Sequence, residues 1–342
     1  MIRPPDAVDI TPISKIDWES KGARAYSVPF TSDGMWARTR MPLYVASSGK
    51  PGKTIVAIGG THGDEYEGPV ALKNLVTSFD VNRLTAGRLI VIPVFTVSAF
   101  YADQRASAED GVNMNRAFPG RADGSISYRM ARFLTDEVLS RADVVIDIHS
   151  GGRGYQIAPT MSFHAVDDPE LRRQFKETAF LFGTPFTMIY TSGMGTGLLT
   201  EEAEKMGKIT IGSELGYGAS TDIDGVRWAY HGVQNVMRHH GLIDEPVEDL
   251  TLEKWGKTQR LIQNIDIDTW ITSPIAGISE PLAPLGSYVT AGTPVARVHD
   301  FYRWDEPGVD ILADQDGYVL CRKFRSKTEQ GEVVMVIARE ID

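Results

Sequence analysis

Cysteine is nearly absent from this sequence, and its scarcity excludes two kinds of site. The chain contains a single cysteine, Cys321. A disulfide framework within the chain, or a zinc site built from cysteines, needs at least two. We therefore expect neither a disulfide-stapled fold nor a cysteine-rich metal site.

Long apolar runs and an excess of positive charge are also missing. No stretch approaches the roughly 20 apolar residues of a membrane span, and the N-terminus, "MIRPPDAVDI", lacks the apolar region of a secretion signal. The formal net charge of -10 argues against a general binder of nucleic acid or anionic membranes, because both need a basic surface. We expect a soluble, cytoplasmic protein whose partner is a small molecule. The oligomeric state stays open, with a homo-oligomer as one alternative.

The composition is that of an ordinary globular chain, but its pattern changes along the sequence. From residue 54 to about 240, short apolar strands alternate with helical patterns, which is typical of a largely parallel sheet covered by helices. After residue 265, short strands are separated by glycine and proline. The sequence predicts an α/β fold with a mixed, largely parallel sheet over residues 1–245. A linker over 246–269 and a small all-β domain over 270–342 follow.

Two histidines and a glutamate follow two of the buried-strand patterns. The stretch "GGTHGDEYEG", residues 59–68, comes after the apolar run "TIVAI" and contains His62 and Glu65, and His149 comes after the run "VVIDI". Of the seven histidines, only these two directly follow such a run. Ligands bind at the carboxyl ends of strands in open α/β sheets, so the three side chains are expected to meet. Two histidines and one carboxylate, with a fourth position open for water, form a known catalytic zinc set.

Each of these residues alone has a structural alternative. His149 suits a buried core histidine, and Glu65 suits a turn. Two short motifs at two strand ends make coincidence less plausible and favour the metal site. Asp147 lies two residues before His149, on the same face of the strand. Because carboxylates orient metal-binding histidines, we assign Asp147 to His62 or to a neighbouring backbone group.

Four further polar side chains are candidates for the chemistry. Glu214 ends the apolar strand pattern of "KITIGSELGYG", where it could act as general base beside a metal-bound water; a structural salt bridge is the alternative. The irregular stretch "RASAEDGVNMNRAFPG" supplies Arg105, Asn115 and Arg116. Arg116 could hold a substrate carboxylate with two hydrogen bonds, and Arg105 could stabilise an oxyanion formed from an amide carbonyl. Isolated arginines are also often plain surface charges.

The motifs together resemble those of a known enzyme family. "GGTHGDEYEG", "NMNRAFPG", "DIHSGG" and "SELG" look like the succinylglutamate desuccinylase/aspartoacylase family, a branch of the zinc carboxypeptidase-like fold. The resemblance covers roughly residues 45–240 and the small β domain. It implies that His62, Glu65 and His149 bind one Zn²⁺ and that Glu214 is the general base. It also implies that Arg105 polarises the scissile carbonyl, and that Asn115 and Arg116 hold a substrate carboxylate.

The resemblance also bears on the substrate and on the β domain. The spacing between Arg105 and Asn115 resembles that of longer-loop members rather than aspartoacylase itself, and the chain looks closest to the bacterial deacetylases of ectoine breakdown, which act on N-acetyl-2,4-diaminobutanoate. Residues 270–342 resemble a lipoyl/biotinyl-type barrel-sandwich without the Met-Lys-Met attachment site, so no carried cofactor is expected. In this family such a domain caps the site and restricts it to small substrates.

These observations lead to one principal hypothesis and two rivals. The principal hypothesis is a zinc amidohydrolase that removes a short acyl group from an N-acylated amino acid. The first rival is a metallocarboxypeptidase-like peptidase, which a narrow, capped pocket would disfavour. The second is a binding protein that keeps the fold without catalysis, and the joint presence of His62, Glu65, His149 and Glu214 speaks against it.

Overall fold

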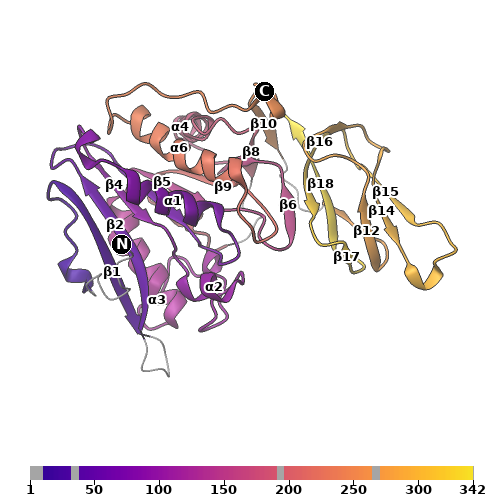
Figure 1. Ribbon diagram of the computed structural model, residues 1–342, viewed down its shortest axis with the longest axis horizontal. Coiled ribbons are helices and arrows are strands. Elements are labelled where there is room, and N and C mark those ends of the chain that lie inside the picture. Colours follow the sequence, from indigo (N-terminus) through magenta and orange to yellow (C-terminus); the bar gives the residue numbers. More distant parts are fainter. Residues whose placement is uncertain (1–10, 32–37, 191–195, 264–269, 342) are drawn as a thin grey trace.

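The chain forms a large α/β lobe from which a smaller β lobe projects at one end (Figure 1). The computed structural model describes residues 11–31, 38–190, 196–263 and 270–341. We call the part up to residue 263 the large lobe and the part from residue 270 the small lobe. No helix in these ranges is both long and apolar enough to cross a membrane.

One large sheet runs through both lobes. Its main order is β1-β2-β4-β3-β5-β9-β7-β8-β10-β18-β16-β13. The strands are β1 (Gly22–Thr31), β2 (Arg38–Ser47), β3 (Thr54–Gly59), β4 (Arg88–Ile92), β5 (Val144–Ile148), β7 (Thr160–His164), β8 (Phe186–Tyr190), β9 (Ile209–Glu214), β10 (Arg260–Gln263), β13 (Tyr288–Val289), β16 (Gly317–Lys323) and β18 (Val333–Glu340). Two short strands pair at the side, β6 (Tyr155–Ile157) with β16 and β11 (Ile271–Thr272) with β18.

Within the large lobe the sheet is mixed and mostly parallel, as the sequence predicts. Strands β4, β3, β5 and β9 are parallel neighbours, and so are β7, β8 and β10. Strands β1 and β2 join antiparallel at one edge, and β7 runs antiparallel to β9. The carboxyl ends of β3, β5 and β9 therefore lie side by side, which is where the candidate residues follow.

Helices cover both faces of this sheet. They are α1 (Glu67–Ser78), α2 (Val97–Ala102), α3 (Ile126–Phe133), α4 (Pro169–Phe180), α5 (Leu199–Lys205) and α6 (Ile223–His239). Strand β3 is buried on both sides, and its residues alternate between two cores. Ile55 and Ala57 face the core that contains α1, α4 and α6, whereas Val56 and Ile58 face the core that contains α3 and α5. This two-sided burial explains why the strand reads as a continuous apolar run.

The small lobe is all-β, as expected from its sequence. A second sheet has the order β15-β14-β12-β17, with β12 (Gly277–Pro281), β14 (Pro294–His299), β15 (Val309–Leu312) and β17 (Lys327–Thr328). It packs against β13, β16 and β18 around a separate apolar core that includes Val295, Val298, Val319 and Ile337. The small lobe therefore has a core of its own.

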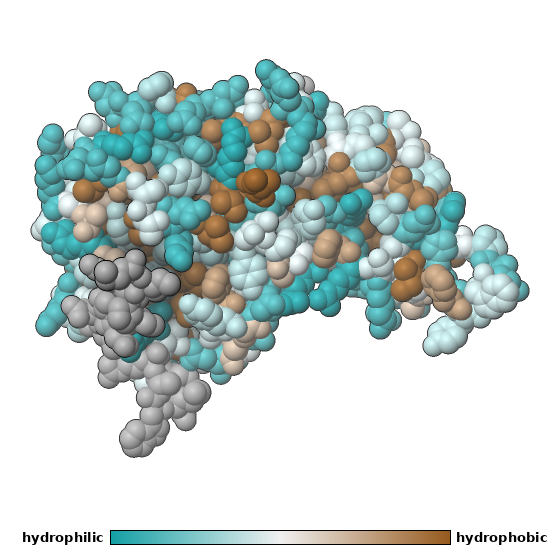
Figure 2. All heavy atoms as spheres, in the orientation of Figure 1, coloured by the Kyte–Doolittle hydropathy of each residue, from teal (hydrophilic) through white to brown (hydrophobic). Residues whose placement is uncertain are grey.

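Strand pairing, rather than a free connection, joins the two lobes. Strand β10 lies within the segment expected to be a linker, and it pairs with β8 of the large lobe and with β18 of the small lobe. Strand β6 of the large lobe pairs with β16. Residues 264–269 of the expected linker lie outside the described residues. Hydrophilic side chains are mixed with pale and hydrophobic ones on the face seen in Figure 2, and the smaller lobe projects clearly from the larger one.

Candidate active site

Two neighbouring strands deliver the three candidate metal ligands. Gly59 at the end of β3 is in register with Ile148 at the end of β5, so the residues that follow them are close in space. The loop after β3 needs Gly63, because a Cβ there would lie 2.0 Å from the carbonyl carbon of Ala99. This close approach of two backbone segments accounts for one of the glycines in "GGTHGDEYEG". It also holds the loop that carries His62 and Glu65.

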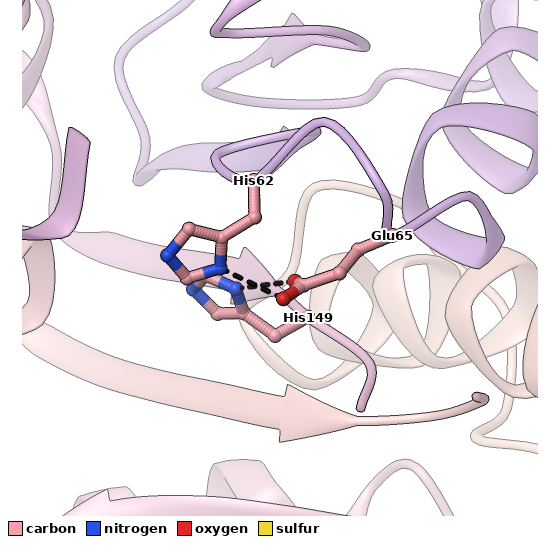
Figure 3. Close-up of side chains that lie close together, drawn as sticks. All are labelled: His62, Glu65 and His149. Atoms are coloured by element: carbon pink, nitrogen blue, oxygen red, sulfur yellow. Dashed lines mark hydrogen bonds and ion pairs between the residues drawn. The ribbon is translucent and has the colours of Figure 1, made fainter. Parts of the chain in front are cut away.

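The three side chains converge on one point (Figure 3). Nδ1 of His62 lies 2.8 Å from one carboxylate oxygen of Glu65, and Nδ1 of His149 lies 2.8 Å from the other. One potential ligand atom from each residue lies within 4.8 Å of the others. Glu65 is only 2% exposed, and the backbone N–H of Ser150 also donates to it. These three residues form a candidate metal site.

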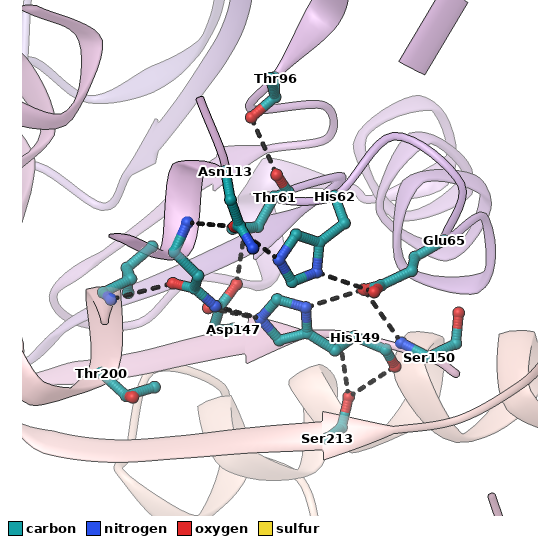
Figure 4. Close-up of polar contacts among 12 residues, drawn as sticks. Thr61, His62, Glu65, Thr96, Asn113, Asp147, His149, Ser150, Thr200 and Ser213 are labelled. Carbon is teal, nitrogen blue, oxygen red and sulfur yellow. Dashed lines mark hydrogen bonds and ion pairs between the residues drawn. The ribbon is translucent and has the colours of Figure 1, made fainter. Parts of the chain in front are cut away.

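The outer nitrogen of each imidazole faces an oxygen acceptor (Figure 4). Nε2 of His62 lies 3.1 Å from Oδ1 of Asn113, and Nε2 of His149 lies 2.8 Å from Oδ2 of Asp147. With Nε2 as the donor to these acceptors, Nδ1 is the ring nitrogen that a metal would bind after loss of the proton it shares with Glu65. Two Nδ1 atoms and one carboxylate form a donor set that suits a divalent transition metal such as zinc, so the residues fit the predicted metal.

The position of Asp147 corrects one expectation. Its carboxylate contacts His149, not His62, because the two side chains lie two residues apart on the same strand face. Its other oxygen accepts a hydrogen bond of 2.8 Å from the hydroxyl of Thr61. Asp147 is fully buried. Its two contacts fix the orientation of the His149 ring at Nε2 and connect β5 to the loop after β3.

The electrostatics of Glu65 favour its ionised form. Burial alone would raise the pKa of this carboxyl, but the adjacent His62 and His149 outweigh that effect and hold the pKa well below its usual range. An ionised carboxylate is the form that binds a metal. Arg105 adds positive charge, since its guanidinium donates to Glu65 over 3.1 Å.

Glu214 lies at the end of β9, the next strand in the sheet after β5. Burial, followed by the charge of Glu65, raises the pKa of Glu214 to about 8. Its Oε2 is buried and has no hydrogen-bond partner among the described residues. A cation bound at the neighbouring site would favour the carboxylate form again. A carboxylate poised between the two states is suited to proton transfer.

A cavity of about 140 Å³ brings the predicted residues together. We call it the site cavity. Six of the seven residues singled out in the sequence as metal, catalytic or substrate-binding candidates, together with Asp147, are part of its lining: His62, Arg105, Asn115, Arg116, Asp147, His149 and Glu214. Among the three candidate ligands, Glu65 does not line the site cavity; it contacts both histidines from the protein interior.

Asn115 and Arg116 lie on a short 3-10 helix, Met114–Arg116, rather than in the irregular loop that the sequence suggested. Asn113 caps this helix, because its side chain accepts from the backbone N–H of Asn115. The backbone N–H of Leu199 donates to Oδ1 of Asn115, so its amide nitrogen faces His149 at 3.1 Å. The Arg116 guanidinium donates to the carbonyl of Asn115 over 2.6 Å. The two side chains thus present donors to one cavity wall.

Some residues of the site lie within the quoted motifs but were not assigned a role from the sequence. Asn113 and Thr61 contact the site through His62 and Asp147, and the hydroxyl of Ser213 accepts from the backbone N–H of His149. Glu67 is fully buried and accepts from the backbone N–H of Asp222, which connects the start of α1 to the segment after β9. Asn113 is the first residue of "NMNRAFPG" and Ser213 the first of "SELG", so the motifs contained these residues without indicating their contacts.

Comparison with known proteins gives this geometry a context. Residues 51–240 match the family model described as the succinylglutamate desuccinylase/aspartoacylase catalytic domain. The chain belongs to this family. The matched span contains every candidate site residue and ends before the small lobe.

Individual relatives extend the similarity to the whole chain. An N-alpha-acetyl-L-2,4-diaminobutyric acid deacetylase from Halomonas elongata is 32% identical over 97% of this chain and 96% of that protein. Among solved structures, a succinylglutamate desuccinylase/aspartoacylase from Rhodobacter sphaeroides is 28% identical with a TM-score of 0.89, covering 96% of this chain and 98% of that chain. The product-bound ectoine utilization protein EutE (DoeB) from Ruegeria pomeroyi is 30% identical with a TM-score of 0.86, covering 95% and 98%. Both lobes of this family member are therefore part of the shared fold.

Proposed function

We propose that this protein is a zinc-dependent amidohydrolase that removes a short acyl group from an N-acylated amino acid. The observation that carries the proposal is the convergence of His62, Glu65 and His149 beside a cavity that Glu214 also lines. These three residues would hold the zinc. When bound, zinc supplies a water of lowered pKa and a Lewis acid for the acyl carbonyl.

The remaining steps belong to side chains of this chain. Glu214 takes a proton from the attacking water and returns it to the leaving amine, for which its unpartnered, buried Oε2 is suited. Arg105 lines the same cavity and stabilises negative charge as it develops on the acyl oxygen. The Arg105 side chain is 54% exposed, so it can move from Glu65 towards a substrate.

Asn115 and Arg116 are proposed to hold the α-carboxylate of the amino acid. Both line the site cavity, and the hydrogen bond from Leu199 orients the Asn115 amide towards it. A carboxylate accepts from such donors with strong directional preference. The small volume of this cavity supports a single amino acid rather than a peptide as the group held there.

We infer N-acetyl-L-2,4-diaminobutanoate as the first-choice substrate. The support is the similarity along nearly the whole chain to a deacetylase named for that compound and to an ectoine utilization protein. A neutral carboxamide in place of the α-carboxylate should lower kcat/KM by roughly 10²-fold, because the buried Asn115 amide and the exposed Arg116 guanidinium lose a charged acceptor.

The test compares N-acetyl-2,4-diaminobutanoate, N-acetylaspartate and N-succinylglutamate, each beside its α-carboxamide, by release of the free amine. Equal rates for an acid and its carboxamide would remove Asn115 and Arg116 from carboxylate binding. A clear preference for N-acetylaspartate would overturn the choice of amino acid while leaving the zinc mechanism in place. Absence of any turnover by the zinc-loaded protein would favour a non-catalytic binding protein.

A further inference from the structure

A second cavity, of about 410 Å³, lies at the seam between the two lobes. We call it the seam cavity. Leu320 on β16 and Val333 and Val336 on β18 line it from the small lobe. Tyr155 and Ile157 on β6 line it from the large lobe. Its walls are therefore largely apolar, and both lobes are needed to form it.

The two cavities meet at the residues proposed to act on the scissile bond. Arg105, Met188 and Glu214 line both of them, whereas Asn115 and Arg116 line only the site cavity. A substrate whose carboxylate is held by Asn115 and Arg116, and whose amide lies beside Glu214, has only its acyl group left to place. That group points away from the site cavity and therefore into the seam cavity.

The charges that face the seam cavity determine which acyl groups suit it. Asp64 and Glu214 both line it, and each has a buried carboxylate oxygen without a hydrogen-bond partner among the described residues. Two arginines also line it: Arg105, which the proposed function assigns to the acyl oxygen, and Arg153, which pairs with Asp103. A negatively charged acyl group would approach these two carboxyl groups, one of them the unpaired oxygen of Asp64, without an arginine left to pair with it, which disfavours it.

We propose that the seam cavity is the acyl subsite, and that it accepts unbranched, uncharged acyl groups longer than acetyl while discriminating against succinyl. The inference rests on the proposed function, since it uses the assigned places of the carboxylate and the amide. An acetyl group contributes one methyl to a cavity of about 410 Å³. Each further methylene that the apolar wall covers should raise kcat/KM by about fourfold.

The first experiment uses the zinc-loaded wild-type protein and one amino acid carrying four different acyl groups: acetyl, butanoyl, hexanoyl and succinyl. Butanoyl and succinyl have the same number of carbons and differ in the terminal carboxylate. We expect butanoyl to exceed acetyl, and succinyl to fall at least roughly tenfold below butanoyl. A steep fall from acetyl to butanoyl, or equal rates for succinyl and butanoyl, would overturn the inference while acetyl hydrolysis kept the proposed function. Hydrolysis of none of the four would overturn both.

The second experiment narrows the cavity from the small lobe. Val333→Phe fills part of the seam cavity, and Val309→Phe adds the same side chain at an exposed position on β15 of the same lobe. Val333→Phe should lower kcat/KM for hexanoyl at least about tenfold more than for acetyl, and Val309→Phe should leave that ratio unchanged. Val336→Phe serves as a second narrowing variant if Val333→Phe does not fold. Equal losses for both acyl groups would exclude these side chains from acyl selection, and the wild-type series decides the case even without either variant.

Discussion

The two lobes contribute different kinds of side chain to the seam cavity that lies between them. The charged residues lining both cavities come from the large lobe, and several follow the carboxyl ends of β3, β5 and β9. The small lobe contributes Trp270, Leu320, Cys321, Val333 and Val336, none of which carries a charge. Loops at strand ends can hold buried carboxylates and imidazoles because neighbouring backbone N–H groups and side chains satisfy them. Regular strands of a second lobe are better suited to provide an apolar wall.

Removing a metal ligand from the large lobe should have the largest effect on zinc binding and activity. His149→Ala deletes one of three converging ligands, so bound zinc should be largely lost and activity abolished. His299→Ala is the matched control, because His299 lies in the small lobe and pairs with Glu280 far from this cluster. Elemental analysis and amine release measure both variants. Full zinc content in His149→Ala would remove His149 from the site.

Changing the proposed base should separate chemistry from metal binding. Glu214→Gln keeps the size of the side chain, and Glu214 is not one of the converging ligands, so zinc should stay bound. Turnover should fall by about 10²- to 10⁴-fold because the amide cannot accept the proton. Glu280→Gln in the small lobe, where the side chain is exposed, should leave turnover unchanged. Near-normal turnover in Glu214→Gln would eliminate it as the base.

A smaller effect on zinc affinity and activity is expected from changing Asp147, which contacts the metal ligand His149. Asp147→Asn keeps the shape of a fully buried side chain but weakens the acceptor that orients His149. Zinc affinity or activity should fall by roughly 10- to 100-fold. Competition with a chelator of known affinity measures the first quantity. If chelator titration and turnover both match the wild type, the contact between Asp147 and His149 has no functional role.

Much of this arrangement could be predicted from local patterns. Runs such as "TIVAI" and "VVIDI" have the composition of strands buried on both faces, and β3 and β5 are such strands. Residues directly after parallel strands share one edge of the sheet, so His62, Glu65 and His149 could be expected to meet without knowledge of the exact pairing. The resemblance to the family likewise rested on short motifs, and the family model covers the span that contains them.

Contacts that depend on long-range register could not be predicted in the same way. The expected partner of Asp147 was wrong, because the choice between His62 and His149 depends on how the loop after β3 folds. The pairing of β10 with β18 and of β6 with β16 joins segments far apart in the sequence, and no local pattern encodes it. The seam cavity follows from these pairings, so it too was invisible to reasoning from the sequence.

The smallest effect on turnover should come from changing an apolar residue of the small lobe that lines the seam cavity. Such a change tests whether the small lobe affects stability rather than chemistry. Leu320 is buried at the seam and packs in a cluster with Phe186 and Ile262 of the large lobe. Leu320→Ala removes apolar contacts on that side, while the side of Leu320 that faces the cavity already lacks packing partners. The free energy of unfolding should therefore fall by about 2 kcal/mol, near the lower end for buried leucines. Zinc content and kcat for an acetylated substrate should stay close to wild type, since no charged group has moved.

Urea unfolding, elemental analysis and turnover measure the three quantities together. Loss of zinc alongside an unchanged unfolding midpoint would show that the small lobe supports the metal ligands directly, and the division of roles between the lobes would then be wrong.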